Sequence, residues 1–257
     1  MDKPEMCNVL EVREEGEGVK TIRLEKTLDA TPGQFVMLWL PGIDEKPFSL
    51  SKIKGGIEIT FDKKGPFTEA LYKIKKGERV GVRGPYGKGW KLEGGNVCIV
   101  AGGLGLAPLM PLIESGAERL TVIHGVRNKG RVIFEERLEK SRVKLHYSSD
   151  DGSFGKHCYA CDILADFIKA SDFDQVLCCG PEILMKKVVD ICKNASVACQ
   201  VSLERYMKCG IGICGSCAFG SKGLRICVDG PVFEREDVED GEFAAFHLDK
   251  SGTKLKL

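Results

Sequence analysis

Apolar and polar residues alternate in short stretches along the first third of the chain, with glycine or proline between the stretches. A period of two places alternate side chains on one face, which is typical of half-buried β-strands. Such strands are predicted at residues 9–13, 19–25, 35–40, 57–61 and 79–83, with one short helix at residues 67–74. Closely spaced short strands of this kind predict a small β-barrel over residues 1–92.

The pattern changes after residue 95, where apolar runs suited to buried strands alternate with segments of helical periodicity. Strands are predicted at residues 97–101, 120–124, 143–146 and 175–179, and helices at residues 107–115, 132–140, 161–169 and 182–194. This alternation predicts a parallel α/β layer over residues 95–203. The chain that follows is rich in glycine and cysteine and too poor in apolar residues to build a core of its own.

Residues 97–113 carry no charge, yet they do not predict a membrane span. The run is short for a span, and three glycines and two prolines interrupt it. A buried strand that turns sharply into a helix explains it better. The first eight residues lack the apolar segment of a secretory signal, so we expect a cytoplasmic protein without a membrane span.

Charge and cysteine content narrow the function further. The 257 residues include 38 Lys and Arg against 37 Asp and Glu, a formal net charge of +1, which argues against a nucleic-acid partner. Four of the twelve cysteines fall between Cys209 and Cys227. In a protein that is not exported, clustered cysteines indicate a metal or redox centre rather than disulfides.

The four clustered cysteines have the spacing C-x4-C-x2-C…C of plant-type [2Fe–2S] centres. They are Cys209, Cys214, Cys217 and Cys227. Glycines at positions 210, 212 and 215 can adopt positive φ angles, which would let the loop wrap around a cluster. A zinc site is the alternative, although zinc sites favour two short C-x2-4-C pairs. We therefore interpret the four cysteines as iron–sulfur ligands.

Two glycine-containing turns each follow a predicted strand and open a predicted helix. They comprise Gly102, Gly103 and Gly105 in the first turn, and Cys179, Gly180 and Pro181 in the second. Glycine at such a junction lets the backbone approach a pyrophosphate, and two such turns on one sheet would line a nucleotide-binding crevice. Ordinary turn chemistry is the alternative explanation.

Two further motifs lie in the predicted barrel and combine a cation, an aromatic ring and hydroxyl groups. They comprise Lys46, Pro47, Phe48 and Ser49 on a strand, and Gly65, Phe67 and Thr68 at a helix start. Phe48 could pack on a flavin ring while Lys46 and Thr68 contact its phosphates. A plain core strand is the alternative.

Together these motifs resemble the ferredoxin-reductase superfamily, and within it the electron-transfer subunits of NAD-linked dihydroorotate dehydrogenases. The resemblance extends over essentially the whole chain and includes motifs at residues 32–35, 84–87 and 150–155. Two positions depart from the family pattern. Lys46 stands where the family usually has arginine, and Phe67 replaces the second glycine of the phosphate turn, so details of flavin contact should differ.

The resemblance implies three domains: an FAD-binding β-barrel (1–92), a Rossmann-like NAD-binding α/β domain (95–203) and a small [2Fe–2S] domain (204–257). It implies an electron-transfer subunit of pyrimidine biosynthesis. Electrons would come from an FMN-containing dihydroorotate dehydrogenase catalytic subunit and pass through the [2Fe–2S] cluster and FAD to NAD⁺. The complex would contain two copies of each subunit. We expect no catalytic residue in this chain, because the cofactors carry the chemistry.

Other functions stay open on the sequence alone. The chain could serve as the diaphorase subunit of a hydrogenase or of a flavin-based bifurcating oxidoreductase, or as a zinc-stabilised interaction protein. The nicotinamide is also ambiguous. Arg127 and Lys129 favour NADP by charge, whereas Asp150, Asp151 and the family resemblance favour NAD. We expect NAD.

Overall fold

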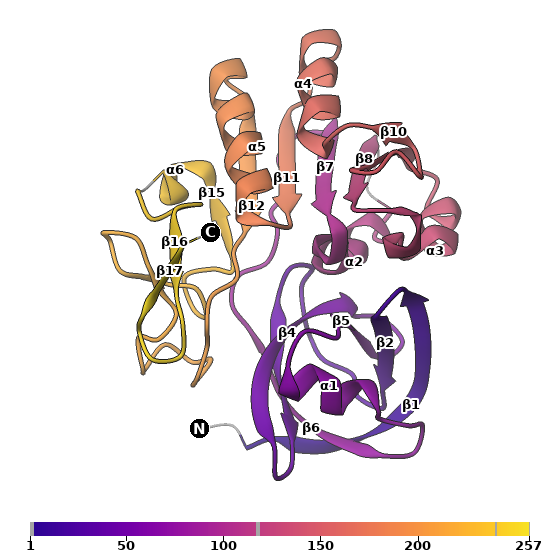
Figure 1. Ribbon diagram of the computed structural model, residues 1–257, viewed down its shortest axis with the longest axis vertical. Helices are drawn as coiled ribbons and strands as arrows, with labels where there is room; N and C mark the ends of the chain where they lie inside the picture. Colours follow the sequence, from indigo (N-terminus) through magenta and orange to yellow (C-terminus); the bar gives the residue numbers. More distant parts are fainter. Residues whose placement is uncertain (1–2, 117–118, 240, 257) are drawn as a thin grey trace.

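The computed structural model describes residues 3–116, 119–239 and 241–256. Its first part is a closed antiparallel barrel with the strand order β1-β2-β5-β4-β3-β6 (Figure 1). The strands are β1 (Glu5–Gly16), β2 (Val19–Leu24), β3 (Phe35–Leu40), β4 (Asp44–Lys52), β5 (Ile57–Asp62) and β6 (Arg79–Tyr86), and helix α1 (Pro66–Tyr72) lies between β5 and β6. Alternate residues such as Val36 and Leu38 are fully buried inside the barrel, as the period of two predicts.

The second part is a seven-stranded sheet with the order β10-β9-β8-β7-β11-β12-β15. Its elements are β7 (Val97–Gly102), η1 (Gly103–Leu109), α2 (Met110–Ile113), β8 (Leu120–Val126), η2 (Lys129–Arg131), α3 (Glu135–Lys140), β9 (Lys144–Ser149), β10 (Lys156–His157), α4 (Ala160–Ala170), β11 (Gln175–Cys179), α5 (Glu182–Ala195) and β12 (Ala198–Ser202). Strands β7 to β12 pair in parallel. The predicted combination of a β-barrel and a parallel α/β layer is confirmed.

The chain builds the sheet outward from β7 in both directions, first through β8 to β10 and then through β11 and β12. The order therefore reverses between β7 and β11, which is where open α/β sheets bind ligands at the carboxyl ends of their strands. These ends face the barrel, because η1 follows β7 directly and packs against β4 and β5 (Figure 1).

Two helices differ from the sequence prediction. The segment predicted as a helix at 107–115 is a 3₁₀-helix through Leu109 and becomes α-helical only at Met110. Pro108 lacks the N–H that a continuous α-helix would need there. The helix predicted from residue 132 begins at Glu135, because Phe134 has a left-handed backbone with φ 59°.

The C-terminal segment has little regular structure of its own. It contains β13 (Ala218–Phe219), β14 (Leu224–Arg225), β15 (Val232–Glu234), α6 (Arg235–Val238), β16 (Phe246–Leu248) and β17 (Lys254–Lys256). Strand β15 extends the sheet by pairing antiparallel with β12. Cys217 and Cys227 share one buried cluster with the barrel residues Phe35 and Met37. The prediction that this segment builds no separate core is confirmed.

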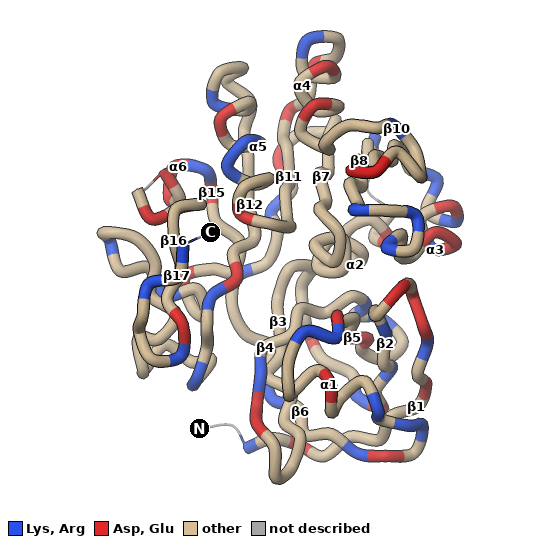
Figure 2. The backbone as a smooth tube through the Cα atoms, in the orientation of Figure 1, with Lys and Arg blue, Asp and Glu red and all other residues tan. Residues whose placement is uncertain are grey.

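Acidic and basic residues are both found on the barrel, on the α/β part and on the C-terminal segment (Figure 2). In the described part of the chain, no helix combines the length and the apolar character needed to cross a membrane.

Candidate cofactor-binding site

The four clustered cysteines come together in two pairs. The Sγ atoms of Cys217 and Cys227 are 3.3 Å apart. The backbone N–H of Cys214 donates to Cys209 Sγ at 3.5 Å, which holds the other two cysteines together. The two pairs are joined through the loop, because the N–H of Gly212 donates to Cys227 Sγ at 3.2 Å.

The loop between Cys209 and Cys214 turns its backbone amides toward sulfur, as a thiolate-ligated cluster requires. Gly210 and Gly212 have φ angles of 70° and 80°, a conformation that glycine adopts without strain. Burial would raise the pKa of the Cys214 thiol, but hydrogen bonds with Ser216 and Cys209 together outweigh burial and lower the pKa to about 6. An exposed thiol with this pKa is largely thiolate, the form that binds metal, at neutral pH.

This arrangement fits a two-iron cluster better than a single metal ion. Among the described residues, no three His, Cys, Asp or Glu side chains are placed to hold one ion. Zinc in a structural site needs four ligands around one point. A [2Fe–2S] cluster has four cysteine ligands for two irons, hence two thiolates for each iron. The donor set therefore favours iron–sulfur over zinc.

The cysteine loop packs directly on the barrel. A Cβ atom built on Gly210 would lie 2.9 Å from Cγ of Met37, so only glycine allows this close contact. Met37 on β3 is paired with Pro47 on β4. The loop therefore lies against the strand next to the one that carries the predicted flavin motif.

The two predicted flavin motifs are neighbours in the barrel. The ring of Phe48 on β4 lies 5.8 Å from the ring of Phe67 at the start of α1. Phe67 is only 6% exposed, so its side chain belongs to the barrel core. The Thr68 hydroxyl accepts hydrogen bonds from the N–H groups of Lys64 and Gly65 at 2.9 and 3.1 Å. The two motifs thus meet through the rings of Phe48 and Phe67 at the β4–α1 side of the barrel.

Lys46 has two neighbours that the sequence did not reveal. Its Nζ atom lies 2.5 Å from a carboxylate oxygen of Asp44 and 5.2 Å from the ring centre of Tyr206. Tyr206 lies three residues before Cys209, so Lys46 is placed between the barrel and the cysteine segment.

The two glycine turns contact each other at the point where the strand order reverses. A Cβ atom on Gly105 would lie 2.3 Å from the carbonyl oxygen of Cys179, and one on Gly102 would lie 2.7 Å from Pro181. Side chains at these two positions would force the turns apart. Gly103 differs, because no atom lies within 4 Å of its Cβ position while its φ is +52°. The turn therefore packs through Gly102 and Gly105 and faces open space at Gly103.

His124 is a functional candidate that no sequence motif indicates. This residue lies on β8, is 0% exposed and hydrogen-bonds through Nε2 to the carbonyl oxygen of Gly103 at 3.1 Å. Burial lowers the pKa of His124 to about 4. A lone histidine in an apolar strand carries no sequence signal for such a contact, because its partner is 21 residues away.

The residues considered for nicotinamide selection lie in two adjacent loops. The N–H of Asp151 donates to the carbonyl of Arg127 at 3.3 Å, and the N–H of Asp150 donates to the carbonyl of Val126 at 3.0 Å. Arg127, Lys129, Asp150 and Asp151 are all exposed. Acidic and basic side chains are thus both present at the same edge of the sheet.

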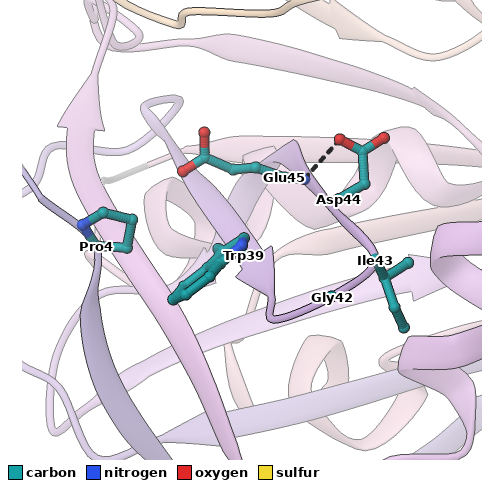
Figure 3. Close-up of a pocket in the computed structure, with 6 residues that line it drawn as sticks. All are labelled: Pro4, Trp39, Gly42, Ile43, Asp44 and Glu45. Atoms are coloured by element: carbon teal, nitrogen blue, oxygen red, sulfur yellow. Dashed lines mark hydrogen bonds between the residues drawn. The ribbon is translucent and has the colours of Figure 1, made fainter.

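A separate hollow of about 450 Å³ lies on the barrel at the β3–β4 hairpin (Figure 3). It is lined by Pro4, Trp39, Gly42, Ile43, Asp44 and Glu45. None of the predicted site residues lines it, and the glycine turns lie elsewhere, so we do not assign it to a cofactor.

Relatives of known family match the chain over nearly its full length. A protein of Methanocaldococcus jannaschii named "Probable dihydroorotate dehydrogenase B (NAD(+)), electron transfer subunit" is 43% identical over 259 residues, covering 99% of each chain. A protein of the same name from Methanocella arvoryzae is 41% identical, covering 99% of this chain and 100% of the relative. This chain belongs to the family of dihydroorotate dehydrogenase B electron transfer subunits.

Other comparisons agree with membership of this family. The family model for the iron–sulfur cluster binding domain of dihydroorotate dehydrogenase B matches residues 204–239, which include all four clustered cysteines. A solved structure of an NADH-dependent reduced ferredoxin–NADP oxidoreductase is 28% identical, with a TM-score of 0.84, and covers 95% of this chain and 93% of that one. The FAD/NAD-binding domain of a Vibrio cholerae nitric oxide dioxygenase has the same fold at 19% identity, with a TM-score of 0.65 over 76% of this chain and 95% of that one.

Proposed function

We propose that this chain takes electrons from a dihydroorotate-oxidising partner subunit and delivers them to NAD⁺ by way of an iron–sulfur cluster and FAD. One observation carries the proposal: three candidate cofactor elements converge. The cysteine loop packs on Met37, next to the flavin strand, and η1 packs on that same strand. Groups held by these elements would be neighbours, as electron transfer between them requires.

Each element suits one group. The thiolates of Cys209, Cys214, Cys217 and Cys227 would hold a [2Fe–2S] cluster, two for each iron. Residues 46–49 and 65–68 would bind FAD, with the Lys46 ammonium exchanging Asp44 for the FAD pyrophosphate. When bound, the cluster exchanges single electrons and FAD exchanges a hydride with nicotinamide. The protein contributes binding, orientation and exclusion of water.

The glycine turns would bind the dinucleotide, with Gly102, Gly103 and Gly105 opposite Cys179, Gly180 and Pro181. The open space at Gly103 supports a pyrophosphate at this point. We infer NAD rather than NADP as the substrate. Asp150 and Asp151 offer carboxylates for a ribose hydroxyl, and they would repel a 2′-phosphate.

We further propose that the partner is an FMN-containing dihydroorotate dehydrogenase subunit, that two copies of each chain associate, and that the complex is cytoplasmic. We also propose that this chain has three functional domains: the barrel (1–92), the nucleotide part (95–203) and the cysteine segment (204–257). The relatives that match over nearly their full length, at 41–43% identity, are named as electron transfer subunits of dihydroorotate dehydrogenase B, which supports this class of partner.

The test is to produce the chain with and without its candidate partner under anaerobic conditions. The chain alone should contain FAD and iron, and should reduce an artificial dye with NADH at a higher kcat/KM than with NADPH. The complex should reduce NAD⁺ with dihydroorotate, and neither chain alone should do so. A colourless zinc protein, or a complex that oxidises dihydroorotate without reducing NAD⁺, would contradict the proposal.

The likeness to the NADH-dependent ferredoxin–NADP oxidoreductase supports a second candidate, a subunit of a flavin-based bifurcating complex. This function predicts oxidation of ferredoxin rather than dihydroorotate. The assay of NAD⁺ reduction with dihydroorotate described above, repeated with reduced ferredoxin as the electron donor, separates the two.

A further inference from the structure

His124 on β8 is buried against the first glycine turn. Its side chain is fully withdrawn from solvent, and its Nε2 atom lies 3.1 Å from the carbonyl oxygen of Gly103. A carbonyl oxygen can only accept, so Nε2 must carry the proton. The ring is neutral at physiological pH, because burial lowers the pKa of His124 to about 4. The other nitrogen, Nδ1, is buried and has no hydrogen-bond partner among the described residues.

The hydrogen bond from His124 fixes the orientation of one peptide plane. The peptide between Gly103 and Leu104 is planar and trans, so its C=O and its N–H point in opposite directions. Because the carbonyl points inward to His124, the N–H of Leu104 must point away from the buried ring. Gly103 has a left-handed φ of +52°, a conformation in which the peptide could otherwise rotate easily.

The turn is open at Gly103. No atom lies within 4 Å of the Cβ position of Gly103, whereas the neighbouring Gly102 and Gly105 are packed against the second turn. The Leu104 N–H, which points away from His124, thus belongs to the peptide that directly follows this open position. A backbone N–H held in this way is a donor suited to a phosphate oxygen.

We propose that His124 is a positioning residue for the dinucleotide: it holds the Gly103 carbonyl inward, so that the Leu104 amide faces the pyrophosphate. This inference rests on the proposed function, because it assumes that the turn binds a dinucleotide. His124 itself touches neither the ligand nor the reacting atoms. Its neutral imidazole supplies orientation alone.

The test uses two variants of similar size, His124→Gln and His124→Met. Glutamine can place an amide donor close to the position of Nε2, and methionine cannot donate. In the FAD-loaded protein, His124→Met should weaken binding of NAD⁺ and of ADP, and raise the KM for NADH, each about tenfold, the loss expected for one hydrogen bond. The kcat at saturating NADH and the FAD content should change less than about twofold. His124→Gln should restore most of the affinity.

The control is a substitution of another buried polar residue on the same strand. Thr121→Val on β8 also replaces a buried polar group, yet it does not contact the turn, so NAD⁺ affinity should stay at the wild-type value. Equal NAD⁺ affinity in the wild type and His124→Met would overturn the inference. So would an equal loss in His124→Met and His124→Gln, because that result indicates packing and not donation. A wild type that binds neither NAD⁺ nor ADP would refute the proposed function instead.

Discussion

Arg205 and Glu182 form an ion pair that is almost entirely withdrawn from solvent, with side chains 2% and 10% exposed. Glu182 is the first residue of α5, directly after the second glycine turn, and Arg205 lies four residues before Cys209. The guanidinium also lies 5.0 Å from the ring centre of Phe219. The pair therefore ties the nucleotide turn to the cysteine segment.

Removing one partner of this pair should be costly, because the other charge stays buried. We expect Arg205→Ala to lower the free energy of unfolding by about 3–5 kcal/mol. The matched control is Lys193→Ala, which breaks the exposed pair with Glu239 and should cost about 0–1 kcal/mol. Urea unfolding of both variants checks this, and equal losses would contradict it.

Gly105 of the first turn should tolerate alanine less well than Gly95, which precedes β7. Gly105→Ala places a methyl group 2.3 Å from a backbone oxygen of the second turn, so the turns must separate. We expect a loss of about 1–3 kcal/mol in stability and a higher KM for NADH. Gly95→Ala meets no atom within 4 Å and should change stability by less than about 0.5 kcal/mol. Unfolding curves and steady-state rates measure both effects.

The cysteine pairs predict which thiols hold iron. Cys214→Ser should reduce the iron content from about two per chain and abolish or alter the [2Fe–2S] EPR signal of the reduced protein. FAD should remain, because the flavin motifs lie in the barrel. Cys158→Ser, at a half-buried thiol outside the loop, should keep both iron and FAD. Iron analysis showing full loading in Cys214→Ser would refute this ligand assignment.

Lys46→Ala tests the contact with the FAD pyrophosphate. If the ammonium makes a charge-assisted bond to phosphate, FAD affinity should fall by about 1.5–3 kcal/mol. Lys186→Ala removes an exposed cation on α5 and should leave FAD affinity unchanged. Fluorescence titration with FAD gives both values. Unchanged binding in Lys46→Ala would mean that backbone and hydroxyl donors hold the phosphates alone.

His124 should make stability depend on pH. Its pKa is about 4 in the folded protein against 6.5 for an ordinary histidine, so the unfolded chain binds the extra proton between these values. Stability from this group is complete above pH 6.5 and is lost as the pH falls toward 4. We expect a loss of about 2 kcal/mol between pH 7 and pH 5 that His124→Gln lacks. Urea unfolding at both pH values measures the difference. Parallel losses in the two proteins would show that other groups cause it.

The barrel could be predicted because alternate strand residues such as Val36 and Leu38 pack inside it, whereas Met37 between them packs against the cysteine segment. Strand β12 was missed, since Gln200 and Ser202 are polar although both are buried. The Gln200 side chain is satisfied by Glu234 and by the N–H of Lys91, partners that only the folded chain brings near. A short strand with buried polar residues has no periodic signal.

The candidate site, too, could be predicted from the sequence only in part. Cysteine spacing is local, so it predicted the loop from sequence. The contacts of Gly210 with Met37 and of His124 with Gly103 join distant segments, and no local pattern encodes them. The two glycine turns are intermediate, because each turn is visible in the sequence but their mutual contact is not.

The core that Cys217 and Cys227 share with Phe35 and Met37 limits how this chain can be recombined with its relatives. A cysteine segment transferred alone from a relative would lack the barrel side chains against which its buried face packs. Grafts that carry positions 35 and 37 along with the segment should yield more properly folded protein than grafts of the segment alone. Substitutions at positions 35 and 37 should, for the same reason, be tolerated better together with changes in the cysteine segment than alone.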